Sequence, residues 1–412
     1  MDRRSALKLA EPCGELFAEH QRDAFGGTFH LSDLAASPRL SSWWSAHHAL
    51  CIRHLDEAAA VEELRTVYSA CQLEDGSVAS DRLLEPDLPD TRDPLARVRD
   101  SAGRSPLIAP PLAAYVAARL SIDGSDAQRD LLDCATRQLD AIWATRLPPD
   151  TALPVILHPL ESPTPTSPLF DSLVESTEPD EWIAEAANLV RSAVACRLDP
   201  ERALRAGHSF VVEDPAFCGW FLLALEEVAS ALALLDDASV AGKLRFRAEM
   251  IAEALVARLW SEDDEIFIGF DRQRSTRVAR VTAAGLIPGA SRMLLAEGTA
   301  KRTVERYMRT AASLLWHDNA IAFNPRDPDS DSANEIWRGK TAPAVLQYWG
   351  HLVLTRASRT ADARALREQL ESRIDRHGFA ESYHAESGEP LPGGNATSGA
   401  LVLEMQHQEA SQ

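Results

Sequence analysis

Residues 158–171 read His-Pro-Leu-Glu-Ser-Pro-Thr-Pro-Thr-Ser-Pro-Leu-Phe-Asp, and they separate two halves of the chain that both have a helical pattern. The stretch holds four prolines and two acids, Glu161 and Asp171. Proline fixes φ and removes a backbone donor, so the stretch can be neither a helix nor a central strand. We predict a stiff, largely extended loop, in a position where binding and catalytic groups tend to sit.

Helical periodicity extends outward on both sides of this loop. In 239–260, for example, apolar residues that include Phe246 recur at steps of three to five and predict one buried stripe. Asp214 followed by Pro215 predicts a helix start. Strand-like segments at Glu265–Phe270 and Arg277–Val281 predict a small hairpin. The predicted helices are 11–22, 43–56, 58–71, 108–120, 126–144, 181–196, 215–236, 239–260, 280–293, 299–315, 341–356, 361–376 and 396–408.

The lengths of the connections predict how these helices are arranged. Short links join helices within a pair and long links join the pairs, with no alternation of strands and helices that would indicate a parallel sheet. We therefore predict an all-α fold, an (α/α)6 barrel whose long loops build a pocket at one end. A helical solenoid is the competing architecture, although no fixed-period repeat is visible. The expected units are an N-terminal extension (1–40), the barrel (41–408) and a tail (409–412), with 76–106 as an exposed loop or flap.

Composition limits the classes of partner. The 412 residues carry a formal net charge of −20, which argues against nucleic acid and anionic membranes. Six cysteines without a CxxC pair, and an N-terminus without an apolar signal segment, favour a cytoplasmic protein. No H-E-x-x-H, P-loop or GxGxxG motif occurs, so we expect no metal or other cofactor. The expected partner is a small molecule, and the oligomeric state stays open.

Several loop segments carry candidate binding residues. Adjacent Trp43 and Trp44 at a helix start can line a sugar site, although core packing explains them equally well. Arg338 can clamp a carboxylate, or it can form a surface ion pair near a helix cap. Glu381 is a candidate general base if it lies in a concave mouth beside aromatic side chains. The candidate substrate-binding residues are Trp43, Trp44, His158, Trp337, Arg338, Gly339 and Tyr383.

Taken together and in order, these segments resemble the glycoside hydrolases of family sixty-three, especially their mannosylglycerate and glucosylglycerate hydrolase branch. The matching segments are Trp43–Ser45, Ile108–Pro111, His158–Pro168, Val212–Pro215, Trp337–Pro343, Phe379–Tyr383 and Gly393–Gly399. The resemblance runs from about Trp43 to Glu404 and implies an (α/α)6 barrel. It also implies inverting hydrolysis, in which an acid protonates the leaving oxygen and a base activates water.

The resemblance assigns the base to Glu381 and the acid to a position where this chain has Pro165. Proline has no proton to give. At four further positions the family has sugar-contacting side chains, and this chain instead has Ser45, Ala109, Ala342 and Ser398.

Three hypotheses follow. The chain is a glycosidase with a relocated acid, Glu161 or Asp171. Alternatively, it is a noncatalytic protein that binds a ligand or partner in the old pocket. The third hypothesis is a pocket repurposed for other chemistry on a less polar substrate. In the first case a substitute acid is needed, because loss of a general acid lowers the rate by about 10²–10⁴-fold.

Overall fold

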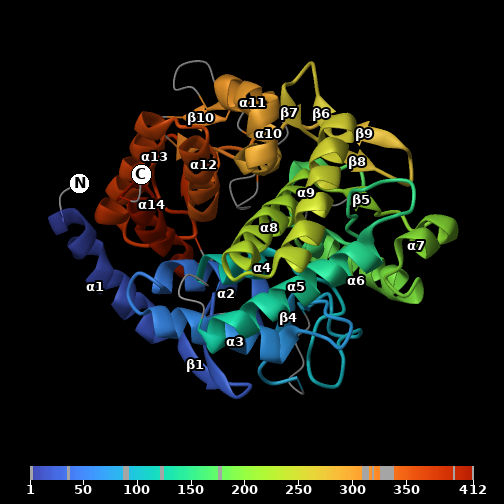
Figure 1. The fold of residues 1–412 in the computed structure, drawn as a ribbon, viewed down its shortest axis with the longest axis horizontal. Helices are drawn as coiled ribbons and strands as arrows, with labels where there is room; N and C mark the ends of the chain where they lie inside the picture. The colour runs from blue at the N-terminus through green and yellow to red at the C-terminus, as the bar shows by residue number, and fades with distance from the viewer. Residues whose placement is uncertain are drawn as a thin grey trace.

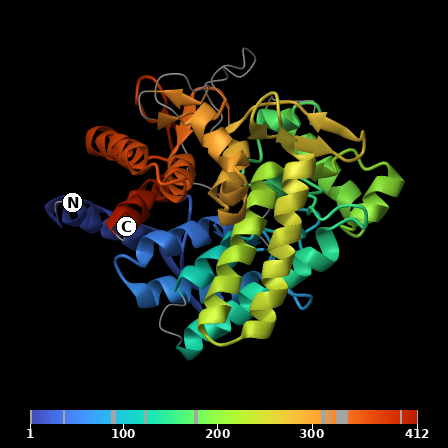
Figure 2. The same ribbon diagram turned by 45° about the horizontal axis from the view of Figure 1, so that its top comes forward.

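The computed structural model describes residues 3–34, 38–86, 92–120, 125–174, 179–308, 315–317, 320–324, 338–392 and 395–410. Helices dominate this part of the chain, and short strands lie in the connections (Figure 1). The N-terminal helix α1 and the C-terminal helix α14 pack against each other, so the two ends of the chain meet on one side of the molecule (Figures 1 and 2).

Six helical elements form a closed inner ring. Each packs against the next, in the order α2, α4, α8, η3, α12 and α14, and α14 returns to α2. Their bounds are α2 (Ser42–Ile52), α4 (Leu112–Leu120), α8 (Pro215–Leu234), the 3-10 helix η3 (Ala283–Ala290), α12 (Ala344–Arg356) and α14 (Leu401–Ala410).

Six outer helices alternate with the inner elements along the chain. Their bounds are α1 (Arg3–His20), α3 (Glu57–Cys71), α5 (Asp126–Arg146), α9 (Ala238–Arg258), α11 (Thr299–Tyr307) and α13 (Thr360–His377). The pairs α2 with α3, α4 with α5, α8 with α9 and α12 with α13 are in direct contact. A closed ring of inner elements with an outer layer is the (α/α)6 barrel, and the predicted fold class is confirmed.

The inner helices are apolar on all sides because they are surrounded by protein. Helix α8 illustrates this, since by length and composition it could cross a membrane, yet 83% of its most apolar window is buried in the fold. The packing is close where α8 meets η3. A Cβ on Gly219 would lie 2.5 Å from Cγ2 of Ile287, so only glycine allows this approach. The apolar character of α8 is that of a core helix.

Three details of the predicted helices need correction. Phe246 is 62% exposed, because the outer helix α9 buries a narrower face than its apolar spacing suggested. The predicted helix at 280–293 is the 3-10 helix η3, which contains Pro288, followed by the short helix α10 (Arg292–Glu297). The short helix α7 (Pro200–Ala206) was not predicted.

Other predictions agree more closely with the structure. Asp214 caps the N-terminus of α8, with Pro215 at its first position, as expected. The predicted hairpin is formed by β8 (Gly269–Asp271) and β9 (Thr276–Val278). The first predicted helix is longer than expected, because α1 begins at Arg3. The predicted tail at 409 begins inside α14, which ends at Ala410, and residues 411–412 lie outside the described part of the chain.

The stretch at 158–171 contains no α-helix and no strand, and it lies between α5 and α6 (Pro179–Ala195). It holds two 3-10 turns, η1 (Pro159–Glu161) and η2 (Pro168–Phe170), each of which begins at a proline. The prolines at these first positions have the φ angle that a helical turn needs.

The small sheets hold the loops in place. β12 pairs with β13, so that Ala342 lies opposite Tyr383, and this pairing fixes the loop that carries Glu381. β3 pairs with β4 in the same way, with Leu40 opposite Arg82. The remaining strands and the last 3-10 helix are β1 (Gln21–Ala24), β2 (Gly27–His30), β3 (Arg39–Ser41), β4 (Asp81–Leu83), β5 (Val212–Glu213), β6 (Trp260–Ser261), β7 (Ile266–Phe267), β10 (Trp316–His317), β11 (Ala320–Ile321), β12 (Thr341–Pro343), β13 (Ser382–His384) and η5 (Ala396–Ala400).

Candidate active site

A pocket of about 400 Å³ lies where the loops that precede several inner helices come together. Trp43 and Trp44 from α2, Pro163 and Pro165 from the proline loop, and Glu381 from the loop after α13 all line it. The other lining residues are Ser32, Arg39, Ser41, Ser80, Asp81, Arg92, Asp93, Pro94, Leu95, Pro110, Leu160, Ser162, Trp182 and Ile183. Segments that are far apart in sequence therefore form one concave site.

Glu381 is the carboxylate that the loop before η5 presents to this pocket. Its side chain is 7% exposed, and the backbone N–H of Asn395 donates a 2.6 Å hydrogen bond to Oε2. Burial raises the pKa of Glu381 to about 7, and the nearby Asp33 acts in the same direction. A carboxyl group with this pKa is half ionised at neutral pH, which suits a general base.

The two tryptophans occupy different positions in the wall. Trp43 is 9% exposed and packs edge-on against His47, Trp220 and Trp349, so most of its ring belongs to the core. Trp44 is more exposed, and its backbone N–H is capped by the Ser41 hydroxyl. Trp43 therefore belongs to the core as well as to the pocket wall, and Trp44 lines the pocket.

Two further carboxylates line the pocket, and neither is among the site residues predicted from the sequence. Asp81 and Asp93 are bridged by the buried guanidinium of Arg99, at 2.7 Å and 2.6 Å respectively. Arg99 is 4% exposed in its side chain, and its contacts with these two acids hold its pKa above the usual range although burial opposes this. Both carboxylates are therefore paired with one cation beside the pocket.

Glu161 lies behind the pocket and is not one of its lining residues. Its carboxylate is fully buried, forms a 2.5 Å ion pair with Arg146, and accepts from the backbone N–H groups of Leu157 and Ile108. These contacts tie the proline loop to α5 and to the start of α4. All are contacts that a structural carboxylate makes.

Asp171 and Arg338, which were predicted as two separate site residues, bind each other. Both guanidinium Nη atoms of Arg338 donate to the two carboxylate oxygens of Asp171, a bidentate pair. Neither residue lines the pocket. The pair joins the end of the proline loop to the segment that leads into β12.

His158 and Tyr383 are buried away from the pocket lining. Nδ1 of His158 accepts from the N–H of Leu160, so Nε2 carries the proton that is donated to the carbonyl of Ala186 at 3.0 Å. Burial lowers the pKa of His158 to about 4, and the ring is neutral. The hydroxyl of Tyr383 donates to the carbonyl of Gly378 at 2.7 Å.

The remaining predicted binding residues belong to the segment before β12. Trp337 lies outside the described residues. Gly339 has a positive φ of 55°, and its N–H donates a 2.5 Å hydrogen bond to Oδ1 of Asn324. It is not a lining residue of the pocket, and its contact is one that shapes the loop.

Comparison with known proteins assigns the chain to a family. The sequence model of the mannosylglycerate hydrolase MGH1-like glycoside hydrolase domain matches residues 37–397. The chain belongs to this family. No curated protein matches it.

Solved structures share the fold of this family member. The GH63 mannosylglycerate hydrolase from Thermus thermophilus, solved with glucose, has a TM-score of 0.80 and 22% sequence identity, over 97% of this chain and 100% of that one. The same enzyme solved with Tris and D-glycerate has a TM-score of 0.81 with 22% identity and the same coverage. Neutral trehalase Nth1 from Saccharomyces cerevisiae is more distant, with a TM-score of 0.56 and 13% identity, over 94% of this chain and 75% of that one.

Within the family framework, the substituted positions are buried or small. Pro165, at the general-acid position that the resemblance implies, lines the pocket and is half-buried. Ser45, Ala109, Ala342 and Ser398 are each at most 1% exposed, and none lines the pocket. Ala342 packs with Ala320, Ala322 and Ala385, so small residues fill this region together.

A chain of buried polar contacts leads to the loop that holds Glu381. The Thr397 hydroxyl contacts Oδ1 of Asn395 and lies 2.7 Å from Nε2 of His48. His48 in turn lies 3.5 Å from Glu63, whose other oxygen is 2.8 Å from Nδ1 of His30. Burial alone would raise the pKa of Glu63, but the bonds to His30 and His48 hold it below its usual range. The chain connects a charged core residue to the backbone that contacts Glu381.

Proposed function

We propose that the pocket binds a small glycoside or a related sugar-like ligand, and that it retains a general base, Glu381, without the family's general acid. On this proposal, hydrolysis of ordinary glycosides is weak or absent, and any hydrolysis inverts the anomeric carbon. The observation that carries the proposal is that Glu381 and Pro165 line the same pocket together with Trp43 and Trp44. The family membership of the chain supports a carbohydrate-related function.

The surroundings of Glu381 support its function as a base. A single backbone N–H holds the carboxylate at Oε2, and burial places the pKa at about 7. Water on the sugar ring would lose its proton to the ionised form, which becomes more abundant as the pH rises through 7. Tryptophan faces in the same pocket suit the C–H faces of a sugar.

The two candidate substitute acids, and the two acids that line the pocket beside Glu381, are each paired with an arginine. Asp81 and Asp93 share the Arg99 cation, Glu161 is paired with Arg146, and Asp171 with Arg338. An acid catalyst must present a proton to the leaving group, whereas each of these carboxyl groups is already engaged with an arginine. These contacts support the hypothesis of a missing acid over that of a relocated one.

Leaving-group chemistry provides the test. A glycosyl fluoride needs no proton on its leaving group, while an alkyl glycoside such as glucosylglycerate or mannosylglycerate does. The purified full chain is incubated with α- and β-glucosyl and mannosyl fluorides and with both glycerate glycosides. We expect fluoride hydrolysis to exceed glycoside hydrolysis by at least about 10²-fold beyond the intrinsic difference in reactivity, because a general acid contributes this much. Glu381→Gln should abolish the fluoride activity.

Each alternative has its own outcome. Efficient hydrolysis of the glycerate glycosides would contradict the missing acid and favour a relocated one. Binding of sugars by calorimetry, without turnover of any fluoride, would favour the noncatalytic alternative. If the protein shows no turnover and binds no sugar, the proposal is contradicted. This outcome would favour a pocket repurposed for a less polar substrate.

We also propose that the protein is cytoplasmic. The six cysteines are all free thiols, and five of them are buried. Burial raises the pKa of Cys13 and Cys71 to about 12, so these thiols stay protonated and unreactive. Unpaired cysteines are typical of a reducing compartment.

A further inference from the structure

The pocket that holds Glu381 has one wall that is apolar. Three segments packed together behind the pocket form it, because Leu95 shares a buried cluster with Val190 of α6, and Leu160 of the proline loop packs against this cluster. Each segment contributes two lining residues to this apolar wall, which consists of Pro94 and Leu95, Pro163 and Pro165, and Trp182 and Ile183.

Most polar residues of the pocket come from other segments. Ser41 lies opposite Asp81 in the pairing of β3 with β4, and Glu381 is on the loop after α13. Asp93 adjoins the apolar wall in sequence, but its carboxylate shares the Arg99 cation with Asp81. Hydroxyl and carboxylate groups bind the hydroxyls of a sugar. A ligand that matches the whole pocket is therefore polar at one end and apolar at the other.

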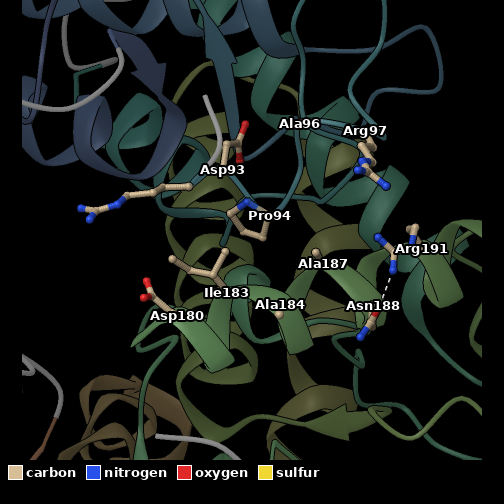
Figure 3. A pocket seen from close by; sticks show the side chains of 11 residues that line it. Asp93, Pro94, Ala96, Arg97, Asp180, Ile183, Ala184, Ala187, Asn188 and Arg191 are labelled. Carbon is tan, nitrogen blue, oxygen red and sulfur yellow. Dashed lines mark hydrogen bonds between the residues drawn. The ribbon is translucent and has the colours of Figure 1, made fainter. Parts of the chain in front are cut away.

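The apolar wall continues to the mouth of the pocket. Pro94 and Ile183 lie toward one another in Figure 3, and both also line an adjoining groove of about 670 Å³ between the segment 92–97 and α6. Ala184 and Ala187 line this groove on the side of α6, where their small side chains leave it open. An apolar group that packs on the wall thus has room to extend beyond the pocket.

The position of Pro165 in this wall determines which leaving groups the site can release. The part of a glycoside that packs on the wall is the part that leaves, and Pro165 gives it no proton. Phenols leave as phenolate ions far more readily than alkyl alcohols leave as alkoxides, because the aromatic ring stabilises the negative charge. An aromatic leaving group therefore suits both the apolar surface and the missing acid.

We propose that the ligand of this pocket is an aryl glycoside, whose sugar lies beside Glu381 and whose aromatic aglycone packs on the apolar wall. The inference rests on the proposed function, because it needs Glu381 as the base and Pro165 in place of the acid. The rings of proline and tryptophan are rigid, so they contact the face of an aromatic ring with little loss of side-chain freedom.

The reaction of such a ligand needs no proton from the wall. Water bonds to the anomeric carbon and loses a proton to Glu381. The bond from this carbon to the phenolic oxygen breaks, and its electron pair leaves with the phenolate. The phenolate takes up a proton from the solvent after release, and Glu381 returns its proton to the solvent.

Binding of inert thioglycosides tests the aglycone independently of catalysis. The full chain is titrated calorimetrically with methyl, phenyl and carboxymethyl 1-thioglycosides of glucose and mannose, as both anomers. For the sugar that binds, we expect the phenyl compound to bind about tenfold or more tightly than the methyl compound, because the wall buries its ring. The carboxymethyl compound, which has a small charged aglycone, should bind no more tightly than the methyl compound.

The other outcomes separate this inference from the proposed function. Equal affinities for the methyl and phenyl compounds, or tightest binding of the carboxymethyl compound, would overturn the aryl aglycone and leave the sugar site standing. Binding of none of the compounds would overturn the inference together with the proposed class of ligand.

Ile183→Ala and Trp182→Ala test the wall itself. Each should reduce the advantage of the phenyl over the methyl compound by about threefold or more, because each removes apolar contacts with the ring. In the described part of the chain, Ile183 belongs to no buried apolar cluster, so Ile183→Ala should fold as the wild type does. This variant keeps the test decisive where Trp182→Ala does not fold.

Val194→Ala is the matched control, since Val194 is a 36% exposed apolar residue on the same helix and lines neither cavity. It should bind all three compounds as the wild type does. An advantage of the phenyl compound that persists in Ile183→Ala, or that Val194→Ala reduces equally, would overturn the assignment of the aglycone to the apolar wall.

A matched pair of substrates tests the leaving group. The 4-nitrophenyl and 4-nitrobenzyl glycosides of the sugar whose fluoride the wild type hydrolyses carry the same aromatic ring, but only the first leaves as a phenolate. We expect similar KM values, with kcat higher for the nitrophenyl glycoside by about 10²-fold or more. Similar kcat values would overturn departure as phenolate, while fluoride hydrolysis that depends on Glu381 would still support the proposed function.

Discussion

Glu381 and Pro165 line one pocket, although 216 positions separate them in the chain. A carboxylate whose pKa burial raises to about 7 thus shares a site with a residue that has no proton to donate. Inverting hydrolysis needs two carboxyl groups with different functions on opposite sides of the sugar. This chain keeps one of the two at the positions that the family resemblance assigns.

Glu161→Gln should destabilise the protein strongly. The substitution leaves the buried Arg146 without its anionic partner, and breaking a buried pair lowers the free energy of unfolding by about 3–5 kcal/mol. Denaturant unfolding measures this loss. Glu201→Gln is the control, because its pair with Arg205 is exposed and should change stability by less than about 1 kcal/mol. Unchanged stability with a loss of hydrolysis would instead make Glu161 the missing acid.

Asp171→Asn should have little effect on turnover. It weakens the bidentate pair with Arg338, and we expect a loss of stability of about 1–2 kcal/mol from the lost charge. The pH profile of fluoride hydrolysis should keep its shape, since this residue is outside the pocket lining. Loss of glycoside hydrolysis in the variant, with fluoride hydrolysis unchanged, would indicate that Asp171 acts as an acid.

Glu381→Gln should stabilise the protein at pH 8 but not at pH 4. Burial raises the pKa of Glu381 from 4.5 to about 7, so the unfolded chain releases this proton at a lower pH than the folded chain does. Its contribution to stability is therefore present below pH 4.5 and is lost as the pH rises through about 7. Above this range the buried charge lowers the free energy of unfolding by about 3 kcal/mol, and a glutamine at this position avoids the loss. Melting temperatures at both pH values provide the measurement, and equal effects at the two values would contradict the raised pKa.

Thr397→Val should disturb Glu381 through the loop between them, without a direct contact between the two side chains. The hydroxyl that joins His48 to Asn395 is lost, and the loop whose N–H binds Glu381 is held less firmly. We expect slower fluoride hydrolysis with a shifted pH midpoint and a stability loss of about 1–3 kcal/mol. Thr145→Val on α5 is a control of the same chemistry on the surface. A stability loss with an unchanged pH midpoint would show that Thr397 is only structural.

Features that depend on local sequence could be predicted. Asp214 and Pro215 start α8 by capping and a fixed φ angle, both of which are local, and the helical periods predicted the ring elements. Phe246 was wrongly predicted to be buried, because apolar residues spaced three to five apart do not define where the buried stripe of a helix ends. The helix predicted at 280–293 contains Pro288, and the segment around this proline forms the tighter 3-10 helix η3.

Features that depend on long-range contacts could not be predicted. Asp81 and Asp93 lie in a run that is typical of an exposed flap, and only their joint contact with Arg99 turns them into pocket acids. A run with alternating acids and arginines was the available signal, but it does not say which charges meet. His158 is similar, because its proton is donated to a carbonyl of α6 that sequence cannot place.

The most direct test is to restore the acid. Pro165→Asp places a carboxyl group on the pocket wall at the acid position, and Pro163→Asp places one at a neighbouring lining position as control. The substrate is the phenyl glycoside of the sugar whose fluoride the wild type hydrolyses. The measurement is kcat/KM for this substrate, on variants with the same melting temperature as the wild type. We predict that Pro165→Asp raises it by about 10²-fold or more and that Pro163→Asp does not. The contradicting result has two parts. The wild type hydrolyses the phenyl glycoside in a reaction that depends on Glu381, and Pro165→Asp does not increase this hydrolysis. Together they would contradict the loss of the acid.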